Sequence, residues 1–309
     1  MKRDIQPDYF AAAFAPARTT VWHWLAGFTA ILVLTVLGTM ATVFPAYALM
    51  PESWMGAPGD GRFGGFGDYL VLFLVFIPAF VLPLVIFKTF NALPWRRLIT
   101  AAARIRWGHM GRAFGVVMIA YILWSGADYL LFPDGYEEMQ VQTDWTGFAV
   151  LVLITLLLCP IQAASEEILL RGYANLMLVR VFGSKRAGLL AAFVLTSAGF
   201  AALHLGNPEA DGQVWPYMLG TFNFGLAMCA LTQIEGGLES AIGYHIGNNI
   251  FVFSLFGYAD PTLPDSAMFW VPEIAIGYAD VAQEGLVMVG LVALILWLNR
   301  RADACSRVA

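Results

Sequence analysis

Four polar side chains lie in segments that otherwise have the composition of membrane helices, where such side chains are rare. They are Glu166, His204, His245 and Asn249. Glu166 or His204 could remove a proton from water, which is general-base chemistry. His245 and Asn249 could donate hydrogen bonds to the oxyanion that forms when a carbonyl carbon becomes tetrahedral. These residue types therefore indicate hydrolysis by an activated water.

The two adjacent glutamates are expected to play different parts. Successive residues of an α-helix turn by about 100°, so Arg171 shares the face of Glu167, four residues earlier. This acid-then-base order also favours an ion pair. Glu166 faces elsewhere and has no local partner, which suits a base that meets water. The alternative is a salt bridge at the membrane surface, with Glu166 reaching the lipid headgroups.

The two histidines also have neighbours at helical spacing. Phe200 and His204 are four residues apart, so the aromatic ring can hold the imidazole. His245 and Asn249 are likewise four apart and share a face, which Asn248 nearly shares. A single histidine inside a membrane is as often a helix–helix hydrogen bond as a catalyst. Two histidines with an unpaired glutamate favour a catalytic constellation.

A divalent metal such as zinc is an alternative use of the same donors, with Glu166, His204 and His245 as ligands. The sequence has no HExxH motif and no closely spaced pair of ligands on one helix. Asparagine is also a weak ligand for zinc. The sequence therefore favours metal-free catalysis and predicts no certain cofactor, with zinc left open.

Three motifs follow one another in the chain: EEILLR at 166–171, FAALH at 200–204 and HIGNN at 245–249. They match EExxxR, FxxxH and HxxxN. In this order they resemble the CPBP family of intramembrane proteases, which includes the CaaX prenyl endopeptidases and bacterial relatives linked to bacteriocin processing or immunity. The resemblance covers about residues 150–255. It implies an eight-span helical bundle with an intramembrane catalytic cavity open to the cytoplasm.

The resemblance also implies roles for the residues that match the motifs. Glu166 would activate the water together with His204. His245 and Asn249 would form the oxyanion pocket. The residues expected to support these four are Glu167, Arg171, Phe200 and Asn248.

The composition is that of a membrane protein, because 59% of the 309 residues are apolar and only 13% are charged. A soluble domain carries about 25% charged residues. We predict an all-α polytopic protein, with one transmembrane domain over 1–309 and a catalytic core at about 146–257. A spanning helix needs about 20 apolar residues. We expect eight spans, near 21–43, 69–90, 113–132, 146–181, 187–206, 216–234, 239–257 and 281–299.

The fourth predicted span, 146–181, is too long for a simple crossing. It must be tilted, or broken near Pro160. If it left the membrane at Glu166, this residue and His204 would lie about 27 Å apart in depth, at 1.5 Å per residue. The two can meet only if the helix continues within the membrane as far as Arg180.

The charges predict the orientation. Fifteen of the 17 lysines and arginines fall in the two terminal segments, in the connection 88–112 or in the connection 180–186. Positive charge is enriched on the cytoplasmic side, so we expect cytoplasmic termini. The basic, partly apolar segment 93–107 is expected to lie along that interface, and His109 to be solvated. A bacterial inner membrane is the expected location, with the endoplasmic reticulum as the alternative.

The sequence thus predicts an intramembrane endopeptidase that uses a glutamate-activated water. Its expected partners are a peptide or protein substrate, lipidated or not, and membrane lipids, with no nucleic acid. A proton-coupled transporter with a relay of Glu166, His204 and Asp128 is the first alternative, although the chain shows no inverted repeat. The second is a non-cleaving family member that acts in bacteriocin immunity.

Overall fold

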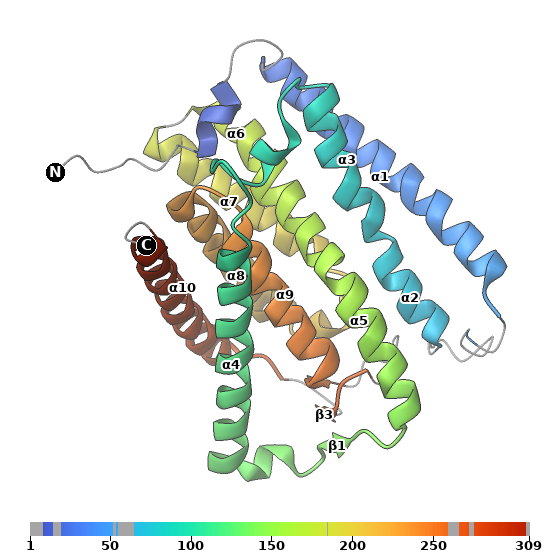
Figure 1. Cartoon of the computed structure of the whole chain (residues 1–309). Coiled ribbons are helices and arrows are strands. Elements are labelled where there is room, and N and C mark those ends of the chain that lie inside the picture. Colours follow the sequence, from blue (N-terminus) through green and yellow to red (C-terminus); the bar gives the residue numbers. More distant parts are fainter. Residues whose placement is uncertain are drawn as a thin grey trace.

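The computed structural model describes residues 9–14, 20–51, 54, 65–183, 185–258, 266–271 and 275–306. Within them the chain is a bundle of helices (Figure 1), which confirms the predicted all-α class. Seven helical stretches of this part of the chain are long and apolar enough to cross a membrane. The protein therefore has a polytopic membrane-type fold. Several charges used to predict its orientation, at residues 2, 3, 18 and 307, lie outside the described residues.

The helices that correspond to predicted spans agree with them to within seven residues at each end. The helical segments of the described chain follow in chain order. They are η1 (Tyr9–Phe14), α1 (Val21–Leu49), α2 (Phe66–Leu74), α3 (Phe76–Thr89), η3 (Trp95–Leu98), α4 (Trp107–Leu131), η4 (Pro133–Tyr136), α5 (Trp145–Glu166), η5 (Glu167–Ala174), α6 (Asn175–Phe182), α7 (Arg186–Leu203), η6 (Pro208–Ala210), α8 (Val214–Glu235), α9 (Glu239–Ser254) and α10 (Tyr278–Ser306).

A small sheet, which the sequence analysis did not predict, joins three short strands at one end of the bundle (Figure 1). The strands are β1 (Gln140–Val141), β2 (Phe256–Tyr258) and β3 (Phe269–Val271). Their order is β1-β3-β2, with β1 antiparallel and β2 parallel to β3. This sheet ties the segment between α4 and α5 to the segment that follows α9.

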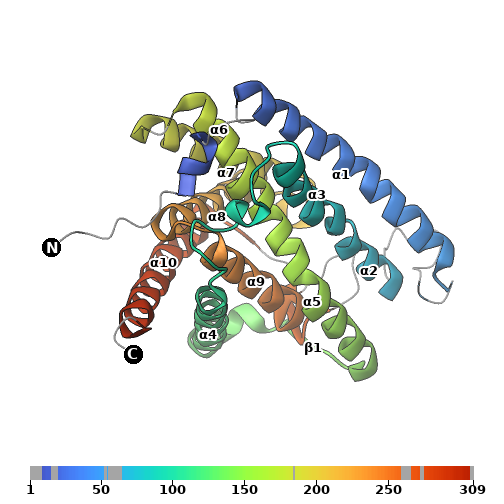
Figure 2. The ribbon, with the colours of Figure 1, turned by 45° about the horizontal axis from the view of Figure 1, so that its top comes forward.

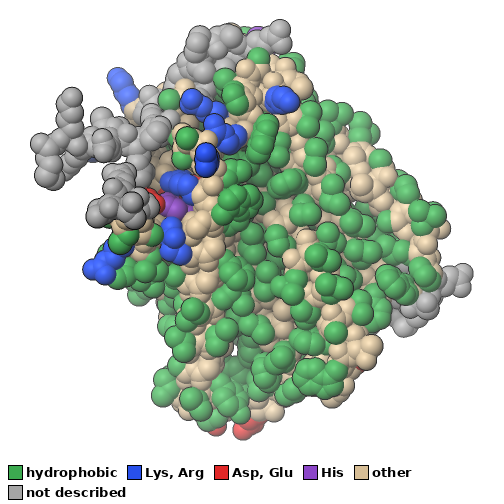
Figure 3. All heavy atoms as spheres, in the orientation of Figure 1, with side chains coloured by type: hydrophobic (Ala, Val, Ile, Leu, Met, Phe, Trp, Pro, Cys, Tyr) green, Lys and Arg blue, Asp and Glu red, His purple; other side chains and the backbone are tan. Residues whose placement is uncertain are grey.

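The outer surface has the pattern expected of a membrane protein. Figure 3 shows hydrophobic side chains over most of the visible face, with lysine and arginine gathered toward one end. Exposed basic residues of the α3–α4 connection, among them Arg97 and Arg104, belong to that basic end. Glu137 and Glu138 are exposed in the α4–α5 connection, at the opposite end of α4. The charges therefore divide between the two ends of the bundle.

Helix α9 differs from the seventh span that the sequence predicted, 239–257. It has 16 residues, which at 1.5 Å each give about 24 Å, short of a full crossing. Two views show it in the interior, between α4 and α5 (Figures 1 and 2). Most of its residues are buried. A short helix is adequate here because neighbouring helices, rather than lipid, surround it.

Two glycines let α9 approach α4 closely. A Cβ on Gly243 would lie 2.1 Å from the Met110 carbonyl oxygen, and one on Gly247 would lie 3.1 Å from the Phe114 carbonyl oxygen. Glycines spaced in this way are a common means of bringing membrane helices together. The same helix carries His245 between them, and its ring is directed toward the junction of α5 and η5 instead. The GYHIG sequence thus encodes a packing face and a polar face in one turn.

The long fourth span is a single helical stretch from Trp145 to Phe182. Pro160 lies inside α5, and the departure from α geometry occurs later, at the π-helix η5. The expectation of a break near Pro160 is therefore not met, because the wider helix begins at Glu167. Segments of π-helix are rare and frequently occur at functional sites. The helix continues past Arg180, as a meeting of Glu166 with His204 requires.

Part of the connection between α3 and α4, which we expected to lie along the cytoplasmic interface, is buried in the protein. Only Trp95–Leu98 is helical, and Leu98, Ile99 and Thr100 are buried. Its backbone pairs with the α8–α9 turn, since the Leu238 amide donates to the Ile99 carbonyl oxygen. These hydrogen bonds satisfy backbone groups that burial has removed from water.

A group of charged residues, here called the end clamp, joins α4, α8, α9 and α10 at the basic end. It consists of Arg106, His109, Glu235, Glu239 and Asp303. His109 bridges Glu235 at 3.3 Å and Asp303 at 3.1 Å, and is only 4% exposed, so the expectation that it is solvated was wrong. Arg106 donates two side-chain hydrogen bonds to the buried Glu239 carboxylate. Burial lowers the pKa of Arg106, but its bonds to Glu239 reverse this and leave the pKa raised.

Candidate functional site

Glu166 is the last residue of α5, and its side chain is 13% exposed. Its Oε1 atom accepts a hydrogen bond of 2.6 Å from Gln162 Nε2, one turn earlier. Its Oε2 atom is buried and accepts no hydrogen bond from the described residues. That oxygen faces His245 Nε2 at 3.6 Å. Glu166 therefore has a local partner that the sequence analysis missed, but one of its oxygens remains available.

The predicted ion pair between Glu167 and Arg171 is confirmed. Arg171 Nη1 lies 3.2 Å from Glu167 Oε1, and both side chains are 0% exposed. The pair forms across one turn of the π-helix. The Arg171 guanidinium also lies over the Phe200 ring, 4.3 Å from its centroid, which is a cation–π contact. The first and second sequence motifs therefore meet through Arg171 and Phe200.

His245 lies between the two glutamates. Its Nδ1 atom is 2.9 Å from Glu167 Oε1, the same oxygen that accepts from Arg171. Because a carboxylate oxygen accepts, Nδ1 must carry the proton of this bond. The bond fixes the ring so that Nε2 is directed at Glu166. Glu167 thus orients a histidine as well as an arginine, a role that sequence spacing did not reveal.

His204 directly follows the last residue of α7, although we predicted that the span extends to residue 206. Its Nδ1 atom lies 2.8 Å from the Phe200 carbonyl oxygen. A carbonyl can only accept, so Nδ1 donates, and in the neutral ring Nε2 is left as a proton acceptor. The ring centroids of Phe200 and His204 are 4.4 Å apart, which confirms that Phe200 contacts the imidazole.

Phe200 is the common neighbour of the two histidines. Its ring centroid is 4.4 Å from that of His204 and 6.0 Å from that of His245. Within the described chain, no hydrogen bond or ion pair joins His204 to Glu166, His245 or Asn249. The structure therefore brings His204 to the edge of the site through an aromatic ring, and not through a polar contact.

Asn249 reaches the site through an amide that the motifs do not include. Its Nδ2 atom donates to Gln162 Oε1 at 2.8 Å, and its Oδ1 atom accepts from Asn248 Nδ2 at 2.9 Å. Gln162 in turn donates to Glu166. The spacing of Gln162, four residues before Glu166, is the sequence signal that would have identified it.

The proposed zinc ligands are not assembled as a set. Glu166 and His245 are neighbours, but no group of three histidine, cysteine, aspartate or glutamate side chains suited to a metal occurs in the part of the chain that the structure describes. His204 does not complete the set. The geometry of these donors therefore does not fit a three-ligand zinc site.

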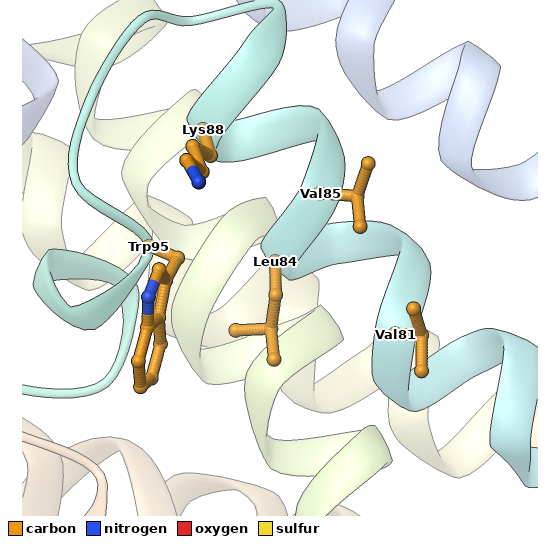
Figure 4. Close-up of a pocket in the computed structure, with 5 residues that line it drawn as sticks. All are labelled: Val81, Leu84, Val85, Lys88 and Trp95. Carbon is orange, nitrogen blue, oxygen red and sulfur yellow. The ribbon is translucent and has the colours of Figure 1, made fainter.

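A surface pocket of about 270 Å³ lies against α3 (Figure 4). Its lining residues are Val81, Leu84, Val85, Lys88 and Trp95. None of the candidate catalytic residues borders it. The pocket is therefore separate from the candidate site, and the intramembrane catalytic cavity remains a prediction.

Comparison with known proteins assigns the same region. Residues 145–251 match the family described as type II CAAX prenyl endopeptidase Rce1-like, and this range includes every candidate site residue. The chain is also 28% identical over 160 residues to "Uncharacterized protein YyaK" of Bacillus subtilis (strain 168). That alignment covers 52% of this chain and 51% of the relative, so it spans about half the length of each. No solved structure matches the chain. The resemblance that the three motifs indicate is confirmed, because residues 145–251 match the Rce1-like family.

Proposed function

We propose that the protein is an intramembrane endopeptidase that hydrolyses a peptide bond with a water activated by Glu166. The observation that carries this proposal is the unequal environment of the two Glu166 oxygens. Gln162 fixes Oε1, whereas Oε2 is buried, accepts no hydrogen bond from the described residues and faces His245. An ionised oxygen in this position can accept a proton from water as the water attacks a carbonyl carbon.

The proton must then reach the leaving nitrogen so that the C–N bond can break. His204 is suited to assist, because the Phe200 carbonyl holds the proton on Nδ1 and leaves Nε2 as an acceptor. In this mechanism Glu166 and His204 share the task of accepting the proton from water and returning it to the amine. The products are a carboxylic acid and an amine, and no redox partner is required.

His245 and Asn249 are assigned to the oxyanion. Asn249 uses one N–H on Gln162, which leaves its second N–H for the substrate oxygen. His245 already donates from Nδ1 to Glu167, so donation from Nε2 requires the doubly protonated ring. These donors would stabilise charge that develops only in the transition state.

The substrate is proposed to be a membrane-associated peptide. The matched family is described by its action on prenylated CAAX sequences, which makes a prenylated peptide the first candidate. The protein is an integral, multi-pass membrane protein. We propose that it lies in a bacterial inner membrane with its basic end on the cytoplasmic side. Water and a peptide would enter the site from that side.

The test uses purified protein in lipid nanodiscs with two peptides of equal sequence, one farnesylated on its cysteine and one not. Cleavage is followed by mass spectrometry for wild type and Glu166→Gln. We expect wild type to cleave the farnesylated peptide and the variant to be inactive. Equal cleavage by both proteins would refute the assignment of the base. Binding without cleavage by wild type would favour the non-cleaving alternative, and proton flux in liposomes would favour the transporter.

A further inference from the structure

A continuous file of hydrogen bonds ends on Glu166. Tyr121 donates from its hydroxyl to Asn248 Oδ1 at 3.2 Å, and Asn248 donates to Asn249 Oδ1 at 2.9 Å. Asn249 donates to Gln162 Oε1 at 2.8 Å, and Gln162 donates to Glu166 Oε1 at 2.6 Å. The file crosses from α4 through α9 to α5. Its bonds shorten steadily toward the carboxylate.

Every bond of this file points the same way. An ionised carboxylate has no proton to donate, so Gln162 must present its nitrogen to Glu166. The Gln162 oxygen then faces Asn249, which must present its own nitrogen, and the same reasoning fixes Asn248. The aligned amide dipoles reinforce one another. Their positive ends are directed at the Glu166 carboxylate.

We propose that Gln162, which lies outside the three motifs, is a positioning residue that couples the base to the oxyanion donor. The two polar atoms of its amide serve the two sides: Nε2 donates to the Glu166 carboxylate so that Oε2 of Glu166 faces His245, and Oε1 accepts from Asn249. The proposal rests on the proposed function. Asn248 and Tyr121 form the outer part of the same device, because they fix the amide of Asn249 from the other side.

A merely structural role would predict something different. Buried amides need partners, and loss of one partner costs stability wherever it occurs. Gln162→Met keeps the length of the side chain but removes both hydrogen bonds. If the role is structural, this variant should lower stability and leave the kinetics of the folded fraction unchanged. If Gln162 positions the base, the kinetics of the folded fraction should change.

The experiment measures kcat, KM and the unfolding midpoint for wild type, Gln162→Met, Tyr121→Phe and a control. We expect kcat of Gln162→Met to fall by about 10²-fold, the lower end of what a misplaced base or oxyanion donor costs. KM should barely change. Tyr121→Phe should show the same changes at smaller size.

The matched control is Tyr69→Phe, which removes the buried 2.7 Å hydrogen bond between Tyr69 and Thr155 of the same helix α5, outside the file. It should retain wild-type kcat and KM. If Glu166→Gln is inactive but Gln162→Met keeps wild-type kcat and KM, the coupling is refuted and the proposed function stands. If Glu166→Gln is fully active, both fall. Should Gln162→Met aggregate, Asn248→Ala carries the same comparison.

Discussion

Two neighbouring glutamates should respond in opposite ways to the same chemical change. Glu166→Gln and Glu167→Gln each replace a carboxylate by an amide of equal shape. We expect the first to abolish cleavage and leave the fold intact. We expect the second to destabilise the fold, because Glu167 neutralises a buried arginine.

The environment of Glu167 sets the size of the loss. Its side chain and that of Arg171 are both 0% exposed, and Glu167 Oε1 also accepts from His245. The Nε and Nη2 atoms of Arg171 make no hydrogen bond to the described residues, so no second acceptor compensates there. Removing one partner of a buried pair costs about 3–5 kcal/mol. The glutamine oxygen remains as a neutral acceptor, so the lower end, about 3 kcal/mol, is expected.

Glu166→Gln should lower the free energy of unfolding much less than Glu167→Gln. Its Oε1 can still accept from Gln162 after substitution, and its side chain reaches the edge of solvent at 13% exposure. No buried cation depends on it alone. The change should therefore stay at about 1 kcal/mol or below, the usual net contribution of one hydrogen bond.

The assay is unfolding by sodium dodecyl sulfate in mixed micelles, with peptide cleavage measured on the same preparations. Glu138→Gln, at an exposed position of the α4–α5 connection, is the control for loss of a charge. Equal destabilisation by Glu166→Gln and Glu167→Gln would refute the division of roles. So would a Glu167→Gln variant as stable as wild type.

Four further predictions follow from the site and its surroundings. Asn249→Ala should lower kcat by about 10²–10³ with little change in KM, as loss of one oxyanion donor does; a change confined to KM would contradict the assigned role. A strong chelator should inhibit weakly and without rescue by zinc, because the three donors are not grouped; elemental analysis that finds one tightly bound zinc per chain would overturn this. Cysteines at the exposed positions Ala103 and Glu138 should be labelled from the cytoplasm and from the opposite side, respectively, and labelling from the reverse sides would invert the orientation. Gly243→Ala should destabilise the protein, because its Cβ would meet the α4 backbone, whereas Gly115→Ala, with nothing within 4 Å, should not; equal unfolding midpoints would contradict the close packing.

Local contacts were the part of the site that the sequence could predict. The pairs Glu167–Arg171 and Phe200–His204 each span one helical turn, and helix geometry places their members side by side. The membrane class and most helix bounds followed from apolar runs of sufficient length. The Gln162–Glu166 bond has the same spacing and was overlooked, although it was accessible to the same reasoning.

Contacts between distant segments could not be predicted. The bond from His245 to Glu167 joins residues 78 apart, and the one from His109 to Glu235 joins residues 126 apart. No periodicity encodes which helices become neighbours. The acidic α8–α9 turn gave no sign of its partners in sequence, because Arg106 and His109 reach it from the start of α4. The short length of α9 was also hidden, since its composition resembles that of a full span.

Because the π-helix η5 joins α5 to α6, the number of residues between Glu166 and α6 determines how α6 is rotated relative to α5. Deletion of one residue between Ile168 and Ala174 would relieve the wider turn and rotate all of α6 by about 100° relative to α5. Asn175 would then leave its 2.9 Å bond to Thr196 of α7. Substitutions along this segment alter single contacts, whereas a one-residue deletion alters the register of a whole helix. Homologues should therefore conserve the length of this segment, and an alignment gap at this point would mark a relative with a differently packed α6.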